Sequence, residues 1–349
     1  MKDIVHIDLN AFFAQAECLR DKSLVDKPLA VGYDGRRGVV ATCSYKAREF
    51  GVHSGMPMSM AKELCPQIII VEGHYEYYRY LSKKFFGYLK KRYPILEQAS
   101  IDECYIDMTK EIDHEDIHGY LFDLQLALYR STMLKCSIGY GANKFLAKMG
   151  SDYKKPMGLT ILTKDKVSKL LWPLPIEKMF GIGIKTAPRL RALGILTIGD
   201  LAQTIDPAVR KVLGSSFEYY QGEANGYGDD FVDPSLFDPK SCSAERTFSE
   251  DITEYDEIRD MIRICSQEVS RELKKYHKKA NVISIKLRDD TFRTWSRRMT
   301  LPHSIQEAGE IFSQAMTIFD RCYADEKLRL IGVGVEKVSP EEEEDDEDR

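Results

Sequence analysis

The sequence predicts an α+β protein built from more than one domain, and three observations support this class. The chain has 349 residues, too many for one small core, which suggests two or three compact units. Strand-like and helix-like segments are mixed in its first part, with short antiparallel pairs, as in α+β folds. A helical stretch follows, and then a segment rich in Gly, Pro and Asp, 226–240, which is typical of an interdomain linker.

The composition is that of a soluble globular protein, with 43% hydrophobic and 30% charged residues. The first residues, MKDIVHIDLN, carry charges at once and lack the apolar core of a signal peptide. The longest purely aliphatic run, IIIV at 68–71, is too short to span a membrane. The eight cysteines form no CxxC pair, which argues against a zinc ribbon and a disulfide framework. We therefore expect a cytoplasmic protein.

The net charge of −5 is unevenly distributed along the chain. The last segment, 339–349, holds eight acids and one Arg, and the rest of the chain has 49 basic and 47 acidic residues. We expect this acidic tail to be disordered. From Arg271 to Arg298 there are ten Lys or Arg residues against three acids. That segment is a candidate surface for an anionic polymer, and a solvated face is the alternative.

The hydrophobic pattern indicates the elements in chain order. In the first part, the expected strands are DIVHIDL, LAVGY, GVVATCS, IIIVE, ILEQA, CYIDM and CSIGYGA, and the expected helices are NAFFAQAECLR, YKAREFG, 74–92 and 113–134. ILEQA and CYIDM are expected to pair around a tight turn that holds Asp102 and Glu103. Residues 164–220 are expected to be helical. After the linker, we expect strands at NVISIKLRDD and RLIGVGVEKV and amphipathic helices at 254–279 and 304–324.

Three carboxylates stand out because their segments could meet. Asp8 ends the strand in HIDLN, and Asp102 and Glu103 lie at the turn in SIDEC. If the two segments are neighbours in one sheet, the carboxylates converge at its edge and repel each other unless cations are bound. Magnesium prefers carboxylate oxygens, and two such ions can clamp the oxygens of an in-line phosphoryl transfer. From these residues alone, an ordinary solvated turn is the alternative.

A second group of residues could face phosphates. Tyr45 and Arg48 are three residues apart in TCSYKAREFG and would share a helix face, with Thr42 just before them. SDYKKPMG adds Lys154 and Lys155 before a turn. Such side chains could hold a triphosphate opposite the metal ions, and solvated surface positions are the alternative.

The segment FGIGIKTAPRLRALGI, 180–195, has the pattern of a helix-hairpin-helix. Gly181 and Gly183 lie in a short hairpin that is followed by Lys185, Thr186 and an Arg-bearing helix. The backbone N–H groups of such a motif face a nucleic-acid phosphate without reading bases. A glycine-capped helical turn is the alternative.

Two further matches to short patterns are interpreted as structural. HEDIH, from His114 to His118, fits the HExxH pattern of zinc proteases, but it follows Asp113, a plausible helix cap, and has no third ligand nearby. QLALY, 125–129, is similar to peptides that dock on sliding clamps. It lies within a predicted helix with the periodicity of core residues, so we expect packing there.

Taken together, six segments resemble the ordered motifs of Y-family translesion DNA polymerases, with the bacterial DNA polymerase IV type nearest. The resemblance covers roughly 1–338, and the segments are HIDLNAFFAQAE, VVATCSYKAREFGVHSGMP, ASIDECYID, SIGYGANKFLAKMGSDYKKPMGL, FGIGIKTAPRLRALGI and SAERTFSEDI. Six motifs in the right order are far more specific than any one alone.

The resemblance implies roles for individual residues. Asp8 and Asp102 would share two magnesium ions, with the carbonyl of Leu9, and Glu103 would complete the site of the ion near the primer 3′-hydroxyl. Phe13 matches the steric gate that rejects a 2′-hydroxyl, and Phe12 beside it is core, nucleotide contact or both. The positions that match the incoming triphosphate are Thr42, Tyr45, Arg48 and Lys155.

The resemblance also implies a right-hand architecture and an activity. The palm would be 1–10 and 74–165, the small fingers 11–73, the thumb 166–229, the linker 230–239 and the little finger 240–338. The implied activity is template-directed DNA synthesis by a monomer on primer-template DNA with deoxynucleoside triphosphates. It would be error-prone, of low processivity and without proofreading, and would serve damage tolerance. Relatives often end in a peptide that binds the sliding clamp, whereas this sequence ends in acids, so clamp recruitment by this route is in doubt.

Two rival functions belong to other classes. A non-catalytic DNA-binding scaffold could keep the fold and the hairpin, but the intact Asp8, Asp102 and Glu103 argue against it. A cyclase-like two-metal enzyme would have no use for a helix-hairpin-helix or a basic C-terminal domain.

Overall fold

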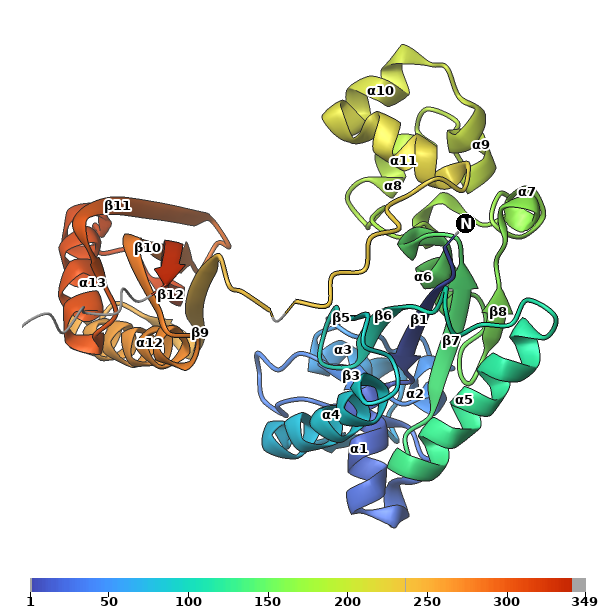
Figure 1. Ribbon diagram of the computed structural model, residues 1–349. Coiled ribbons are helices and arrows are strands. Elements are labelled where there is room, and N and C mark those ends of the chain that lie inside the picture. Colours follow the sequence, from blue (N-terminus) through green and yellow to red (C-terminus); the bar gives the residue numbers. More distant parts are fainter. Residues whose placement is uncertain (1, 236, 341–349) are drawn as a thin grey trace, which may run out of the picture. The chain divides into compact units, whose positions relative to one another are not determined.

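A computed structural model describes residues 2–235 and 237–340 of the chain (Figure 1). The chain divides into two compact units, unit 1 (Met1–Ser235) and unit 2 (Leu236–Arg349). The division falls inside the predicted linker. Most of the predicted acidic tail, 341–349, lies outside the described residues, whereas Ser339 and Pro340 still belong to the last strand.

A five-stranded sheet forms the centre of unit 1, and its strands follow the order β5-β6-β1-β7-β8. Neighbouring strands are antiparallel except for the parallel pair β7–β8. Together with the helices around it, this sheet confirms the predicted α+β class. The strands are β1 (Ile4–Leu9), β5 (Leu96–Gln98), β6 (Glu103–Asp107), β7 (Cys136–Gly141) and β8 (Leu159–Ile161).

The two faces of this sheet are covered by different helices, which are α1 (Phe12–Arg20), α4 (Tyr75–Lys90), α5 (Ile117–Thr132) and α6 (Lys144–Tyr153). Along β1, alternation places Val5, Ile7 and Leu9 in the hydrophobic core shared with α1, α4 and α5. His6 and Asp8 therefore point to the other face, where α6 packs on β1, β7 and β8 (Figure 1).

A smaller sheet follows α1 in the chain, and Thr42 lies on its strand β3, directly before the helix that carries Tyr45 and Arg48. Its strands lie in the order β3-β2-β4. Ser44 caps α2 by accepting a hydrogen bond of 3.3 Å from the N–H of Ala47, and this cap starts the helix at Tyr45. The elements are η1 (Lys22–Leu24), β2 (Leu29–Val31), β3 (Thr42–Cys43), α2 (Tyr45–Arg48), α3 (Met58–Leu64) and β4 (Ile69–Val71).

The last part of unit 1 is helical, as predicted, and its hydrophobic core is shared with α6. Between 164 and 235 the described residues include no β-strand. Thr197 and Asp200 form a capping box that starts α9. The elements are η2 (Lys164–Lys166), α7 (Val167–Leu170), η3 (Ile176–Lys178), α8 (Ala187–Arg191), α9 (Ile198–Gln203), α10 (Pro207–Leu213), η4 (Gly214–Ser216) and α11 (Phe217–Ala224).

Unit 2 is a four-stranded sheet in the order β11-β10-β12-β9, with α12 and α13 packed together on one face (Figure 1). The pattern analysis missed β9 and β11. Both strands carry many exposed polar side chains, and β11 contains Pro302, so neither shows a clean apolar alternation. The elements are β9 (Ser241–Ile252), α12 (Tyr255–Lys275), β10 (Lys278–Asp289), β11 (Thr294–Ile305), α13 (Ala308–Cys322) and β12 (Leu328–Pro340).

The start of α5 differs from the prediction. The helix begins at Ile117 rather than at residue 113, because the Asp116 side chain caps it by accepting a hydrogen bond of 2.8 Å from the N–H of Gly119. His114 therefore lies before the helix, 3.3 Å from the carboxylate of Asp3, and does not share a helix face with His118. Across the described part of the chain, no helix has the length and apolar character needed to cross a membrane.

The packing of α5 gives a direct test of the core. Leu128 is fully buried, whereas Phe122 on the same helix is 46% exposed. We expect Leu128→Ala to lower the free energy of unfolding by about 3 kcal/mol, because it leaves a cavity. Phe122→Ala should change it by about 0.5 kcal/mol or less. Urea unfolding in a Trp295→Phe background, followed by Trp172 fluorescence, measures unit 1 alone, and equal losses in both variants would contradict the assignment.

Candidate active site

The site is built on the face of the central sheet that α6 covers. Asp8 and Glu103 lie directly opposite each other in the β1–β6 pair. Cys104 and Ile106 point into the core, so alternation along β6 sends Glu103 to the same face as Asp8. This differs from the prediction that Glu103 sits in the turn, because the first residue of β6 is Glu103 itself.

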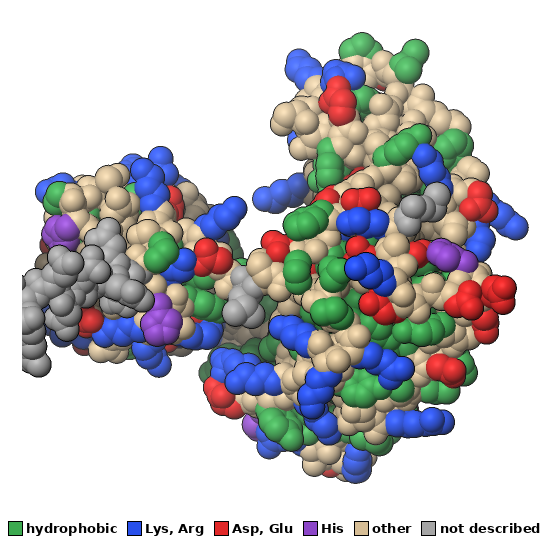
Figure 2. Space-filling view, in the orientation of Figure 1, with side chains coloured by type: hydrophobic (Ala, Val, Ile, Leu, Met, Phe, Trp, Pro, Cys, Tyr) green, Lys and Arg blue, Asp and Glu red, His purple; other side chains and the backbone are tan. Residues whose placement is uncertain are grey.

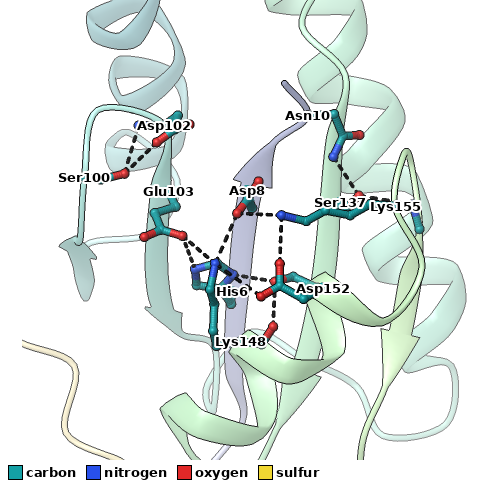
Figure 3. Close-up of polar contacts among 12 residues, drawn as sticks. His6, Asp8, Asn10, Ser100, Asp102, Glu103, Ser137, Lys148, Asp152 and Lys155 are labelled. Carbon is teal, nitrogen blue, oxygen red and sulfur yellow. Dashed lines mark hydrogen bonds and ion pairs between the residues drawn. The ribbon is translucent and has the colours of Figure 1, made fainter. Parts of the chain in front are cut away.

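Two lysines neutralise these carboxylates (Figure 3). The Nζ atom of Lys148, on α6, lies 2.7 Å from a Glu103 oxygen and 3.2 Å from an Asp8 oxygen. Lys155 approaches from the end of α6, with its Nζ atom 2.8 Å from Asp8 and 2.8 Å from Asp152. Like charges directly opposite in a sheet are destabilising, and the ammonium groups offset this cost.

A close approach between α6 and the sheet makes these contacts possible. At Gly139 of β7, an added Cβ atom would lie 2.0 Å from the carbonyl oxygen of Ala147 and 2.2 Å from the nitrogen of Ser151. Any larger residue at 139 would therefore push α6 away and withdraw Lys148. His6 completes the contact, with Nδ1 2.7 Å from the Ser151 hydroxyl and Nε2 3.3 Å from Glu103.

The charges in this cluster shift each other's protonation. His6, together with the ammonium of Lys148, holds the pKa of Glu103 far below its usual range, although burial opposes this. Burial by itself lowers the pKa of Lys148, but the charges of Asp8, Asp152 and Glu103 outweigh it and raise that pKa. Burial lowers the pKa of His6. The cluster therefore places an ammonium between two acidic side chains, beside an imidazole whose charged form burial disfavours.

Asp102 is held apart from this ammonium. It lies in the turn before β6, and the Ser100 hydroxyl donates a hydrogen bond of 2.6 Å to its carboxylate. The Asp102 carbonyl accepts a hydrogen bond of 3.0 Å from the N–H of Leu9, which ties the turn to the end of β1. The predicted convergence of three carboxylates is thus incomplete, and no group of three or more His, Cys, Asp or Glu residues in the described ranges is arranged to hold a metal ion.

The donor set nevertheless suits a hard divalent cation. Burial, assisted by the charges of Asp8 and Glu103, raises the pKa of the Asp102 carboxyl. A cation bound among these oxygens would remove that penalty, because it attracts all three charges. The carboxylates that could hold it are Asp8, Asp102 and Glu103. Leu9, the last residue of β1, could add its backbone carbonyl next to Asp8.

A cavity of about 250 Å³ joins Asp8 and Asp102 to the predicted phosphate-facing and aromatic residues. Arg48 stacks on the ring of Tyr45, with its guanidinium carbon 4.8 Å from the ring centroid. Phe12 is buried and Phe13 is half-buried at the wall. One cavity therefore brings together acidic, basic and aromatic side chains. Its lining residues include Asp8, Leu9, Phe12, Phe13, Thr42, Tyr45, Arg48, Asp102 and Lys155.

Comparison with known proteins gives a consistent family. Residues 7–152 match the impB/mucB/samB family, 239–347 match the C-terminal domain of that family, and 164–195 match the IMS family HHH motif. A DNA polymerase IV of Bacillus velezensis is 38% identical over 343 residues, which are 97% of this chain and 83% of that protein. A DNA polymerase IV of Lactococcus lactis subsp. cremoris (strain SK11) is 39% identical over 345 residues, 96% of this chain and 93% of that protein.

A solved structure, the Y-family DNA polymerase chimera Dbh-Dpo4(243-245)-Dbh, is 25% identical and covers 97% of this chain and 99% of its own, with a TM-score of 0.85. The chain belongs to the Y family of DNA polymerases. The curated relatives place it with the bacterial DNA polymerase IV type, so its activity is template-directed DNA synthesis in damage tolerance. The family and the activity that the sequence motifs implied are both confirmed.

The hairpin of this polymerase lies between η3 and α8. Gly181 has φ +88°, a conformation that favours glycine, and the Tyr220 hydroxyl donates a hydrogen bond of 3.2 Å to its carbonyl. The N–H groups of Thr186 and Ala187 both donate to the carbonyl of Gly183. These two amides are thus engaged within the loop, which also contains the exposed Lys185.

Pattern reasoning missed Lys148 and His6. A lysine four residues before Asp152 on an amphipathic helix is typical of a solvated ion pair, and only the tertiary contact shows that it faces two acids. The available signal was the glycine pair Gly139 and Gly150, which indicates a close helix–sheet approach.

Gln125 of QLALY is buried and donates hydrogen bonds to the carbonyls of Cys136 and Met157, so it serves packing.

The Lys148 contact can be tested through stability. We expect Lys148→Met to lower the free energy of unfolding by about 3 kcal/mol at neutral pH, because it leaves Asp8 and Glu103 without their shared cation. Lys154→Met, at an exposed neighbouring position, is the matched control and should have little effect. Urea denaturation in metal-free buffer measures both, and an unchanged midpoint for Lys148→Met would contradict this role.

Proposed function

We propose that the cavity described above is the catalytic site of the polymerase and that Asp8, Asp102, Glu103 and the Leu9 carbonyl hold two magnesium ions there. The observation that carries this proposal is that a single cavity brings Asp8 and Asp102 together with Tyr45, Arg48 and Lys155. Glu103 lies beside this cavity, directly opposite Asp8 in the sheet. Bound magnesium would activate the primer 3′-hydroxyl and neutralise charge on the phosphates. The Y-family relatives are consistent with a metal-dependent reaction.

The other side chains of the cavity would bind the triphosphate and the sugar of the incoming nucleotide. Arg48 and Lys155 bring positive charge to the triphosphate, and Tyr45 and Thr42 offer hydroxyl groups to its oxygens. Because Arg48 stacks on Tyr45, its guanidinium is already oriented before a nucleotide binds. Phe12 and Phe13 form the apolar wall on which the sugar would rest, and Phe13 is the proposed steric gate.

Two surfaces are proposed to hold the DNA backbone. One is the hairpin with Gly181, Gly183, Lys185 and Thr186 in unit 1. The other is the face of the unit 2 sheet opposite α12 and α13, where a groove is lined by Lys286 and Arg298. Neither surface offers a pattern for reading bases, so binding should be salt-dependent and independent of sequence.

The positive charge of the basic segment, Arg271 to Arg298, is less concentrated on the surface than the sequence suggests. In the view of Figure 2, basic side chains are spread over unit 2 and mixed with acidic ones. Several of them already have acidic partners, and DNA would have to compete for these cations. The pairs are Lys274–Glu307, Lys275–Glu272, Lys278–Asp238, Lys286–Glu245 and Arg298–Glu336.

The predicted division of the chain is retained as a proposal. The palm is 1–10 and 74–165, the fingers 11–73, the thumb 166–229 and the little finger 240–338. We also propose a cytoplasmic monomer that acts on primer-template DNA with deoxynucleoside triphosphates, with low fidelity and processivity and without proofreading.

Primer extension tests the catalytic assignment. With a primed template, four deoxynucleotides and magnesium, the wild type should extend the primer and Asp102→Asn should not, because one metal ligand is lost. DNA affinity, measured by fluorescence anisotropy, should stay within about twofold for that variant because Asp102 lies outside the proposed DNA surfaces. Failure of the wild type to extend would instead support the DNA-binding scaffold.

Sugar discrimination tests the gate. Phe13→Ala should raise kcat/KM for a ribonucleotide relative to the matching deoxynucleotide by about 100-fold, because a ring that would clash with the 2′-hydroxyl is removed. Single-nucleotide incorporation on one template gives both constants. If the ratio of the two kcat/KM values is unchanged, Phe13 is a packing residue only.

A further inference from the structure

The ring of Phe13 is supported from behind by a second aromatic ring. Tyr78, on α4, is fully buried and stacks on Phe13 with ring centroids 4.4 Å apart and an interplanar angle of 13°. Tyr75 meets both rings edge-on, at 5.7 Å from Phe13 and 5.5 Å from Tyr78. Phe13 therefore has the cavity on one side and a packed aromatic cluster on the other.

The hydroxyl of Tyr78 is held by a buried carboxylate. Glu17 is 2% exposed, and its Oε1 atom accepts a hydrogen bond from the Tyr78 hydroxyl. His74, at the start of α4, places its Nδ1 atom 3.0 Å from the same oxygen. Arg20 lies 3.9 Å from the other carboxylate oxygen. A buried carboxylate with these partners fixes the hydroxyl more firmly than a neutral acceptor would.

Two residues on one face of α1 contact both the ring and the hydroxyl of Tyr78. Phe13 and Glu17 are four residues apart on α1 and so lie one above the other on the same face. Tyr78 lies across this face, with its ring on Phe13 and its hydroxyl on Glu17. A shift of Tyr78 along α4 would break the hydrogen bond and remove the support behind Phe13 at the same time.

We propose that Glu17 is a positioning residue for sugar discrimination, which fixes Tyr78 and thereby sets how far the Phe13 ring projects into the nucleotide cavity. This inference rests on the proposed gate role of Phe13. Glu17 does not line the cavity, so it acts only through the two aromatic rings. The alternative is that Glu17 merely stabilises the packing of α1 on α4.

The test compares ribonucleotide and deoxynucleotide incorporation by the full chain on one primed template. We define the discrimination ratio as kcat/KM for the deoxynucleotide divided by kcat/KM for the matching ribonucleotide. Glu17→Leu removes the acceptor and Tyr78→Phe removes only the donor hydroxyl. Both should lower this ratio by about tenfold, chiefly through a lower KM for the ribonucleotide. Glu17→Gln keeps an acceptor oxygen but loses the charge, so it should lower the ratio less than Glu17→Leu does. The double variant should lose no more than either single variant, because both changes break one contact.

Tyr93→Phe is the matched control. Tyr93 is 1% exposed, and its hydroxyl lies 3.0 Å from that of Tyr120, away from the gate. It should lose stability as Tyr78→Phe does and keep the wild-type discrimination ratio. If Glu17→Leu and Tyr78→Phe also keep that ratio while Phe13→Ala lowers it, Glu17 is a packing residue and the proposal fails alone. If Phe13→Ala keeps it too, the gate role and this inference fail together.

Discussion

The contact between the Lys148 ammonium and two carboxylates of neighbouring strands is the constraint on which the site depends. Asp8 and Glu103 face each other across β1 and β6, where like charges would destabilise the sheet. Lys148 can offset this only because α6 packs closely on the sheet at Gly139. The sheet, the glycine and the helix thus form one arrangement that keeps two acids side by side before any metal binds.

The same strand that supplies Asp8 leads directly into α1, the helix that carries Phe13, the proposed gate. Ala11 adopts φ +43° between β1 and α1, and Asn10 ties this junction down through hydrogen bonds to Ser137 and to the N–H of Met157. The Asp8 carboxylate and the Phe13 ring are therefore separated by a short, restrained segment. A change in the sheet would move both, which is why we treat the proposed sugar gate and the proposed metal ligands as parts of one site.

Much of this arrangement could be predicted from the sequence, and the rest could not, for physical reasons. The α+β class, the helical segment and the position of Asp8 at a strand end follow from local periodicity and were confirmed. Glu103 was misplaced because a turn and a strand start differ by one residue, which patterns do not distinguish. Lys148 and Glu17 were missed because a charged residue on an amphipathic helix indicates solvent, and only long-range packing shows its burial.

The central claim is that the carboxylates around β1 and β6 hold the metal ions of the reaction. Binding of Mn²⁺, counted by electron paramagnetic resonance in the presence of primed DNA and a non-hydrolysable deoxynucleoside triphosphate, tests it most directly. We predict about two protein-dependent ions per chain in the wild type and a clear loss of binding in Asp8→Asn, because that carboxylate is shared by both sites. Equal numbers of bound ions in the wild type and in Asp8→Asn would contradict the claim.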